Sequence, residues 1–274
     1  MRTGNIGNEG ERISPLESIM IHPTAVIHAR AEIGADCEIG PYCVIGEKVS
    51  LGRGCKLHSH VVIEGHTRLG PGNEIYPFCS IGLKTQDLKW KGGVTRTEIG
   101  ANNTLREYVT IHSATGDGEV TTVGSDNNLL AYCHVAHNVM IGDHVIMSNV
   151  GTLGGHVVVE DHVVVAGLAA VHQFCRIGKM AMVGGCSKVV QDVPPFMLAD
   201  GNPAETRTIN KVGLERNGVP EEVQTVLRQA YKILFREGLT IPNALARIEK
   251  ELPVSAELQH LAQFVRSSER GISK

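Results

Sequence analysis

Aromatic residues are scarce in this sequence: its 274 residues include five Phe, five Tyr and one Trp, or 4% of the chain. The longest apolar stretch, residues 163–171, falls far short of the roughly 20 residues that a membrane helix needs. The formal net charge is −3, so no excess of basic residues favours nucleic-acid binding. These absences argue against a membrane span and a nucleic-acid partner, and they predict a narrow interior filled by aliphatic side chains.

The cysteines do not suit a disulfide framework. There are seven, an odd number, and no two are spaced as Cys-x-x-Cys, which is typical of a reducing compartment. Residues 1–19 lack the apolar segment of a signal peptide, and we expect them to be a disordered polar tail, with Met20 as an alternative start of the native chain. The sequence therefore predicts a cytoplasmic protein.

An aliphatic residue recurs at every sixth position from Ile21 to Val189. Of the 29 positions in this frame, 26 hold Ile, Leu, Val or Met, and the exceptions are Asp87, Gly93 and Asp117. Many of the 31 glycines directly follow the aliphatic residue, where we expect them to supply an unusual φ at a corner. Three hexads can close an 18-residue triangular coil, and stacked coils would bury a continuous aliphatic rod.

This frame predicts an all-β solenoid over residues 20–194, followed by a small α-helical C-terminal domain over residues 195–274. The breaks in the frame indicate loops ejected from the solenoid near residues 83–98 and 112–122. Apolar residues at helical spacing predict three C-terminal helices. The three stripes are Val223, Val226, Leu227, Ala230, Tyr231 and Leu234, then Leu245, Ile248 and Leu252, and then Leu258, Leu261 and Val265.

Most cysteines take the small-residue position of the hexad, four residues after the aliphatic. We therefore interpret them as packing residues, and only Cys186 falls outside that position. The six are Cys37, Cys43, Cys55, Cys79, Cys133 and Cys175.

Twelve of the 13 histidines precede residue 173. A coil of 18 residues would bring His137, His156 and His172 to one edge of three successive coils, with His134 close by. Neutral imidazoles are suited to proton abstraction near pH 7. The first ejected loop would wall such a site.

A series of motifs resembles one family of hexapeptide-repeat acyltransferases. The motifs IHPTAVI, QDLK, TIH, VGSDNNLL, CHVAHN, GGHVVVED, AVHQFCRIG, MVGGCS and QDVPPF occur in this order over residues 20–218. They resemble the UDP-N-acetylglucosamine acyltransferase family. The resemblance implies a left-handed parallel β-helix and transfer of a (3R)-3-hydroxyacyl group from acyl carrier protein to the 3-hydroxyl of UDP-N-acetylglucosamine, the first step of lipid A biosynthesis. It also implies a homotrimer with sites between subunits and no cofactor, since the phosphopantetheine thioester of the carrier is the acyl donor.

The resemblance also implies roles for single residues. His137 would be the general base, and the Gly155 N–H would stabilise the oxyanion. A glycine at the position that measures acyl length, Gly185, would leave the groove open to a longer chain. The other implied substrate-binding residues are Asp87, Lys89 and His134 on the nucleotide sugar, His156, His172 and Gln173 on the sugar and carrier side, Asn210 on the nucleotide, and Arg216 on the phosphates.

Three positions depart from the family pattern: Asn138 stands where Asp is frequent, Val212 where an acidic residue is common, and Asn217 where Arg is frequent. Whether the acceptor group is a 3-hydroxyl or a 3-amine stays open. A γ-class zinc carbonic anhydrase on the same fold is an alternative, with His134, His137 and a ligand from a neighbouring subunit. A noncatalytic scaffold gives no reason for clustered histidines, and the N-acyltransferase of the pathway would carry an extra N-terminal uridine-binding domain.

Overall fold

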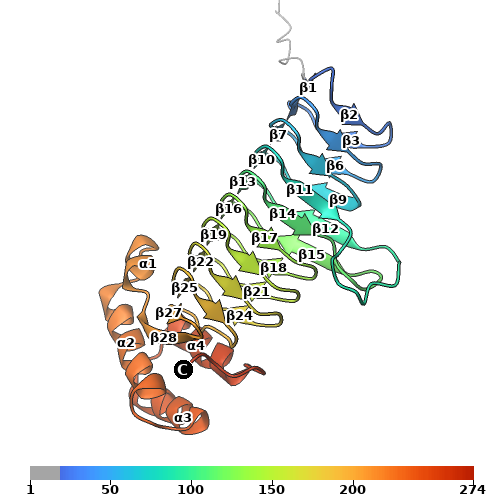
Figure 1. The fold of residues 1–274 in the computed structure, drawn as a ribbon. Coiled ribbons are helices and arrows are strands. Elements are labelled where there is room, and N and C mark those ends of the chain that lie inside the picture. The colour runs from blue at the N-terminus through green and yellow to red at the C-terminus, as the bar shows by residue number, and fades with distance from the viewer. Residues whose placement is uncertain (1–18) are drawn as a thin grey trace, which may run out of the picture.

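The computed structural model describes residues 19–274, which form a three-sided parallel β-helix, here called the prism, followed by helices (Figure 1). The predicted polar tail lies almost wholly outside the described residues. The first sheet contains β1 (Met20–Ile21), β4 (Glu38–Ile39), β7 (Lys56–Leu57), β10 (Glu74–Ile75), β13 (Thr104–Leu105), β16 (Asn128–Leu129), β19 (Ile146–Met147), β22 (Val164–Val165) and β25 (Met182–Val183).

The other two sides of the prism are parallel sheets built from the intervening strands. The second sheet contains β2 (Val26–Ile27), β5 (Val44–Ile45), β8 (Val62–Ile63), β11 (Ser80–Leu83), β14 (Thr110–His112), β17 (His134–Val135), β20 (Thr152–Leu153), β23 (Ala170–Val171) and β26 (Lys188–Val189). The third contains β3 (Glu32–Ile33), β6 (Ser50–Leu51), β9 (His66–Leu69), β12 (Arg96–Ile99), β15 (Val120–Val123), β18 (Met140–Ile141), β21 (Val158–Val159) and β24 (Arg176–Ile177).

Register between coils follows the predicted 18-residue repeat. Met20 pairs with Glu38, for example, and the frame residues stack on one another inside the prism. Two coils are longer because they eject loops: Glu74 pairs with Thr104, and Thr104 pairs with Asn128. Both insertions equal whole hexads, so the aliphatic frame resumes unchanged after each loop.

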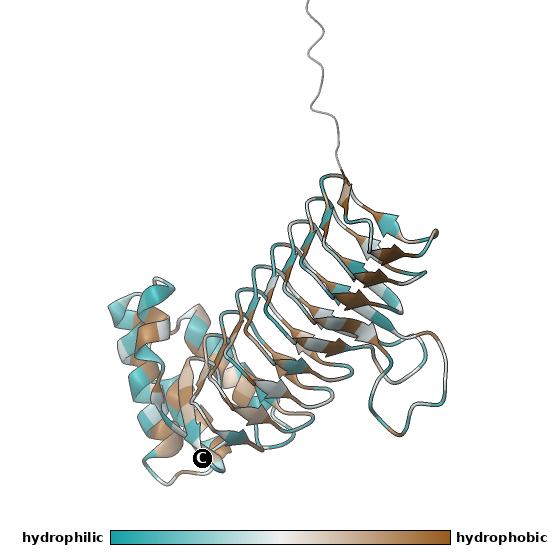
Figure 2. Ribbon diagram, turned by 45° about the horizontal axis from the view of Figure 1, so that its top comes forward, coloured by the Kyte–Doolittle hydropathy of each residue, from teal (hydrophilic) through white to brown (hydrophobic). Residues whose placement is uncertain are grey.

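The interior of the prism is aliphatic, as the scarcity of aromatics predicted. The hydrophobic strand residues alternate with hydrophilic turns along each coil (Figure 2). The six cysteines at the small position are buried and all seven are free thiols, while Cys186 is exposed. Burial raises the pKa of Cys79 to about 12 and that of Cys133 to about 11, so these thiols remain protonated packing groups.

The explanation given above for the repeated glycines is wrong. Glycines after the aliphatic residue, such as Gly40 and Gly52, do not adopt positive φ, with Gly82 as the exception at +74°. They are needed because coils approach closely: a Cβ on Gly52 would lie 2.5 Å from the carbonyl carbon of Gly70 in the next coil. Positive φ occurs two residues later and mostly in other residue types, including the β-branched Val150 at 66°.

The C-terminal region begins with strands. An antiparallel hairpin of β27 (Met197–Gly201) and β28 (Ala204–Ile209) pairs with β25 and extends the first sheet, so the C-terminal region, expected to be helical, also contains two strands. Helices follow at α1 (Lys211–Arg216), α2 (Glu221–Phe235), α3 (Ile241–Glu251) and α4 (Ala256–Arg266). The three predicted stripes lie in α2, in α3 with its C-cap Leu252, and in α4, and they pack into a second core. Among residues 19–274, no helix has the length and apolarity to cross a membrane.

Candidate active site

The loop between β11 and β12 brings Asp87 beside His137. Asp87 Oδ2 lies 3.7 Å from His137 Nε2, and the two side chains are 20% and 13% exposed. The Asp87 N–H donates to Thr85 Oγ1 at 3.0 Å, and Asp87 Oδ1 accepts the Lys89 N–H at 2.9 Å. The hydrogen bond from the Lys89 backbone is the main cause that lowers the pKa of Asp87, with His137 adding to it, so this carboxylate stays ionised.

His137 lies directly on the backbone of the next coil. A Cβ on Gly155 would be 2.4 Å from His137 Nε2, so only glycine leaves room for the imidazole there. The Gly155 N–H donates to no group of residues 19–274 and is free for a ligand. The His156 ring meets the His137 ring edge-on, with centroids 5.2 Å apart. Burial, followed by the charge of His137, lowers the pKa of His156.

The other ring nitrogen of His137 contacts Asn138. His137 Nδ1 lies 3.0 Å from Asn138 Oδ1, which also accepts the Thr115 N–H at 3.1 Å. Asn138 Nδ2 donates to Glu119 Oε2 at 2.7 Å. Glu119 is a residue of the second ejected loop, and no sequence pattern marks it as a site residue, because it lies outside the hexad frame and 19 residues from its partner.

A second histidine pair lies on the neighbouring coils. His134 Nδ1 is 2.7 Å from Thr110 Oγ1, and the His134 ring meets the ring of His112 at 5.1 Å. Burial lowers the pKa of His134 to about 4, and it also lowers the pKa of His112. His112 was not among the predicted site residues, although its TIH motif follows the first ejected loop.

Three predicted site residues lie in the later coils, and His172 follows β23 at the prism edge where His137 follows β17 and His156 follows β20. The His156 ring also stacks on Phe174, with centroids 4.6 Å apart, and exposed His172 places Nδ1 3.4 Å from Arg270 Nη2. Gln173 is exposed beside it. Gly185 is exposed, and a Cβ there would meet only the Gly167 carbonyl oxygen at an ordinary 3.4 Å, so the fold does not require glycine at 185.

The last two predicted residues lie at α1. Asn210 is buried and its amide is engaged within the chain: Oδ1 accepts the Gly213 N–H at 3.1 Å and Nδ2 donates to the Met180 carbonyl at 2.9 Å. The structure thus gives Asn210 a helix-capping role. Arg216 is exposed, and α1 lies on the side of the prism opposite the ejected loop that carries Asp87 (Figure 1).

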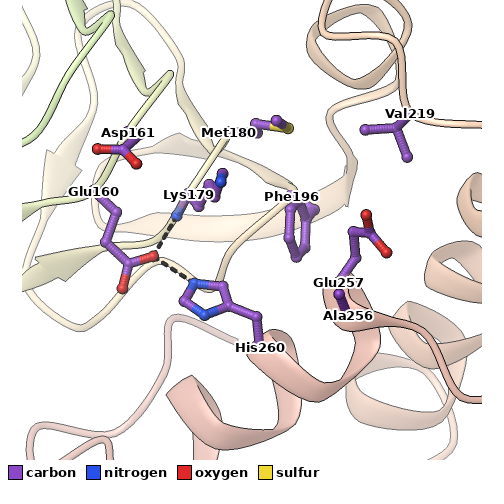
Figure 3. A pocket seen from close by; sticks show the side chains of 9 residues that line it. All are labelled: Glu160, Asp161, Lys179, Met180, Phe196, Val219, Ala256, Glu257 and His260. Atoms are coloured by element: carbon purple, nitrogen blue, oxygen red, sulfur yellow. Dashed lines mark hydrogen bonds and ion pairs between the residues drawn. The ribbon is translucent and has the colours of Figure 1, made fainter.

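A cavity of about 460 Å³ lies elsewhere, between the last coils and α4 (Figure 3). Glu160 bridges its wall: Oε2 lies 2.7 Å from His260 Nε2 and accepts the Lys179 N–H at 2.7 Å. None of the predicted site residues lines this cavity. Its polar groups tie the prism to the helical region.

Within residues 19–274, no three His, Cys, Asp or Glu side chains are grouped so that they could hold a metal ion. A zinc site would therefore need a ligand from another chain, as the carbonic anhydrase alternative assumed.

Sequence comparison decides the family. The chain is 50% identical over 256 residues to the acyl-[acyl-carrier-protein]–UDP-N-acetylglucosamine O-acyltransferase of Thermodesulfovibrio yellowstonii, covering 93% of this chain and 99% of that protein. This chain belongs to the UDP-N-acetylglucosamine O-acyltransferase family. A protein of the same name from Gloeothece citriformis is 44% identical over 183 residues, which span 67% of this chain and 66% of the relative. Residues 192–273 also match the model described as Udp N-acetylglucosamine O-acyltransferase, Domain 2.

Solved structures of this acyltransferase family superpose on the chain. LpxA from Acinetobacter baumannii, at 45% identity, gives a TM-score of 0.90 over 93% of this chain and 100% of that one. The UDP-N-acetylglucosamine acyltransferase of Bacteroides fragilis, at 37% identity, also gives 0.90, over 93% of this chain and 100% of that one. A mirror-image coil could not superpose so closely, so the predicted left-handed parallel β-helix is confirmed.

Proposed function

We propose that this protein transfers a (3R)-3-hydroxyacyl group from acyl carrier protein to the 3-hydroxyl of UDP-N-acetylglucosamine, the first step of lipid A biosynthesis. The observation that carries the proposal is the His137 imidazole, held between Asp87 and Asn138 in a chain of this family. No cofactor is needed, because the acyl group arrives already activated as the phosphopantetheine thioester.

His137 acts as the general base at Nε2. It takes the proton of the sugar 3-hydroxyl while the hydroxyl oxygen attacks the thioester carbonyl carbon. The tetrahedral intermediate then breaks its C–S bond, and the departing thiolate takes the proton back from His137. Asp87, 3.7 Å from Nε2, stabilises the imidazolium that exists between the two proton transfers.

The Gly155 N–H stabilises the oxyanion of the intermediate. It is an unengaged backbone donor directly beneath the His137 ring, so one coil supplies the base and the next supplies the donor. The proposed substrate-binding residues are Lys89, His134, His156, His172 and Gln173, while the capping role of Asn210 makes it a support for α1.

We also propose a homotrimer with its sites between subunits. The ejected loop that carries Asp87 and the helix α1 that carries Arg216 lie on opposite sides of one prism (Figure 1). A single chain therefore does not bring the proposed phosphate-binding arginine to its own His137. A symmetric neighbour supplies the missing half of each site. The seven free thiols suit a reducing compartment, and we propose that the enzyme works in the cytoplasm.

An acyl-transfer assay tests the proposal directly. Purified protein is mixed with UDP-N-acetylglucosamine and 3-hydroxyacyl carrier proteins of graded chain length, and the 3-O-acyl product is identified by mass spectrometry. We expect transfer, with preference for longer chains because exposed Gly185 leaves the groove open, and a shift to shorter chains in Gly185→Met. A parallel reaction with the 3-amino sugar nucleotide identifies the acceptor group. Absence of acylated product at every chain length would contradict the proposal.

A further inference from the structure

We infer that Glu119 is a positioning residue for the catalytic base: through the Asn138 amide it keeps a proton on His137 Nδ1 and leaves Nε2 free to accept one. The catalytic meaning of this inference rests on the function proposed above, but the state of the imidazole does not.

The three side chains form one continuous path. His137 Nδ1 lies 3.0 Å from Asn138 Oδ1, and Asn138 Nδ2 lies 2.7 Å from Glu119 Oε2. The carboxylate is anchored in turn, because Glu119 Oε2 also accepts the Gly116 N–H at 2.7 Å. Asn138 thus stands between the base and an acidic group.

The path allows only one orientation of the Asn138 amide. An ionised carboxylate only accepts hydrogen bonds, so Glu119 requires the NH₂ end of the amide. The oxygen end then faces the Thr115 N–H, a donor, and His137 Nδ1. A nitrogen facing a carbonyl oxygen at this distance carries the proton, so the neutral imidazole is protonated at Nδ1 and its Nε2 lone pair faces the site.

Asn138 is also held by its backbone. Its φ is 60°, in the left-handed region that Asn tolerates better than most residues, and its N–H donates to Thr121 Oγ1 at 2.9 Å. The Asn138 hydrogen bond is the largest of the causes that lower the pKa of Glu119, so the carboxylate is ionised at neutral pH. Together these contacts fix the path from Glu119 through Asn138 to His137, here called the relay, which joins the second ejected loop to the turn after β17.

Substitution of Glu119 separates positioning from substrate binding. Glu119→Ala removes the acceptor that orients the amide, and we expect kcat to fall at least ~10-fold, the lower end of what is lost with the outer-shell partner of a histidine in metal sites, with KM unchanged. Glu38→Ala removes an exposed carboxylate of β4, near the N-terminal end of the prism, and serves as the matched control. A smaller fall in kcat, or a loss carried by KM, would overturn the inference.

A rescue experiment excludes a merely structural role for Glu119. In Asn138→Asp combined with Glu119→Gln, the new carboxylate accepts the hydrogen bond from Nδ1–H directly. The glutamine NH₂ group can donate to this Asp, and its carbonyl oxygen can accept the Gly116 N–H. We expect the kcat of this double variant to lie within about 3-fold of that of the parent enzyme. Asn138→Asp alone should have a lower kcat, because the new carboxylate would lie against that of Glu119. A double variant no faster than Glu119→Ala would overturn the relay.

Nitrogen-15 NMR of histidine-labelled protein tests the imidazole independently of activity. The His137 resonances, assigned by their loss in His137→Ala, should show the Nδ1–H form in the parent protein and a mixture of forms in Glu119→Ala. An Nε2–H form in the parent would overturn the inference even if acyl transfer occurs. Nδ1–H without any acyl transfer would remove the proposed function and leave this inference standing.

Discussion

At the scale of residues, the chemistry depends on histidines that the fold keeps neutral. Burial lowers the pKa values of His112, His134, His156 and His162, which favours the uncharged form of each. Because Asp87 and Glu119 are ionised, negative charge flanks the base while its histidine neighbours add no positive charge near pH 7. The arrangement therefore favours proton acceptance at a single imidazole.

We predict that stability rises with pH between about 4 and 6.5. His134 titrates near pH 4 in the folded chain and near 6.5 when unfolded, so in this interval the unfolded chain binds more protons. His134→Gln should remove at most about 3 kcal/mol of this dependence. Urea unfolding of both proteins across the interval measures it, and parallel stability curves for the two proteins would contradict the prediction.

Individual site residues were predictable only where the frame or a motif held them. His137, His156 and Asp87 were expected to share the site. The structure brings the two histidine rings into contact and places the Asp87 carboxylate beside His137. Glu119 could not be predicted, because the course of an ejected loop depends on local turns and not on the six-residue repeat. The 18-residue repeat placed His172 correctly in the turn after β23, at the same prism edge as His137 and His156, but it did not reveal that the ring stacked on His156 is that of Phe174.

At the scale of elements, the hexad frame determined nearly all strands and even the size of the loop insertions. The backbone reason for glycine was missed because a sequence reveals where glycine recurs but not whether φ or coil spacing demands it. The hairpin of β27 and β28 was missed because it follows the last frame position and has only a few alternating residues.

Substitution by alanine should lower the stability at one glycine of the prism and leave it nearly unchanged at another. In Gly52→Ala the new Cβ meets backbone atoms of the next coil at 2.5 Å, and we expect a loss of about 1–3 kcal/mol in unfolding free energy. In Gly185→Ala the Cβ meets only one atom at 3.4 Å, so the change should stay within about 0.5 kcal/mol. Thermal and urea unfolding measure both, and equal losses would contradict the coil-spacing explanation.

At the scale of the whole molecule, a thin prism cannot surround a nucleotide sugar and an acyl chain by itself. Two opposite sides of the prism carry different parts of the proposed site, with the ejected loops on one side and α1 on the other (Figure 1). The proposed trimer joins these parts without any further domain. This association could be inferred from the sequence only through the family resemblance.

Mixing two impaired variants tests whether sites are shared between subunits. His137→Ala and Arg216→Ala should each be impaired, yet co-refolding them in equal amounts should restore about a quarter of the sites, since random assembly gives that fraction both intact halves. The mixture of separately folded proteins is the control. Activity no higher than the sum of the separate variants would contradict a shared site.

The most direct test of the account is acyl transfer by His137→Ala. We predict that the variant folds like the parent protein and loses ~10²–10⁴-fold in kcat, the contribution typical of a general base. His144→Ala, which removes a histidine stacked on His162 outside the site, should retain parental activity. Transfer by a correctly folded His137→Ala at a rate within about 10-fold of the parent would contradict the assignment of His137 as the base.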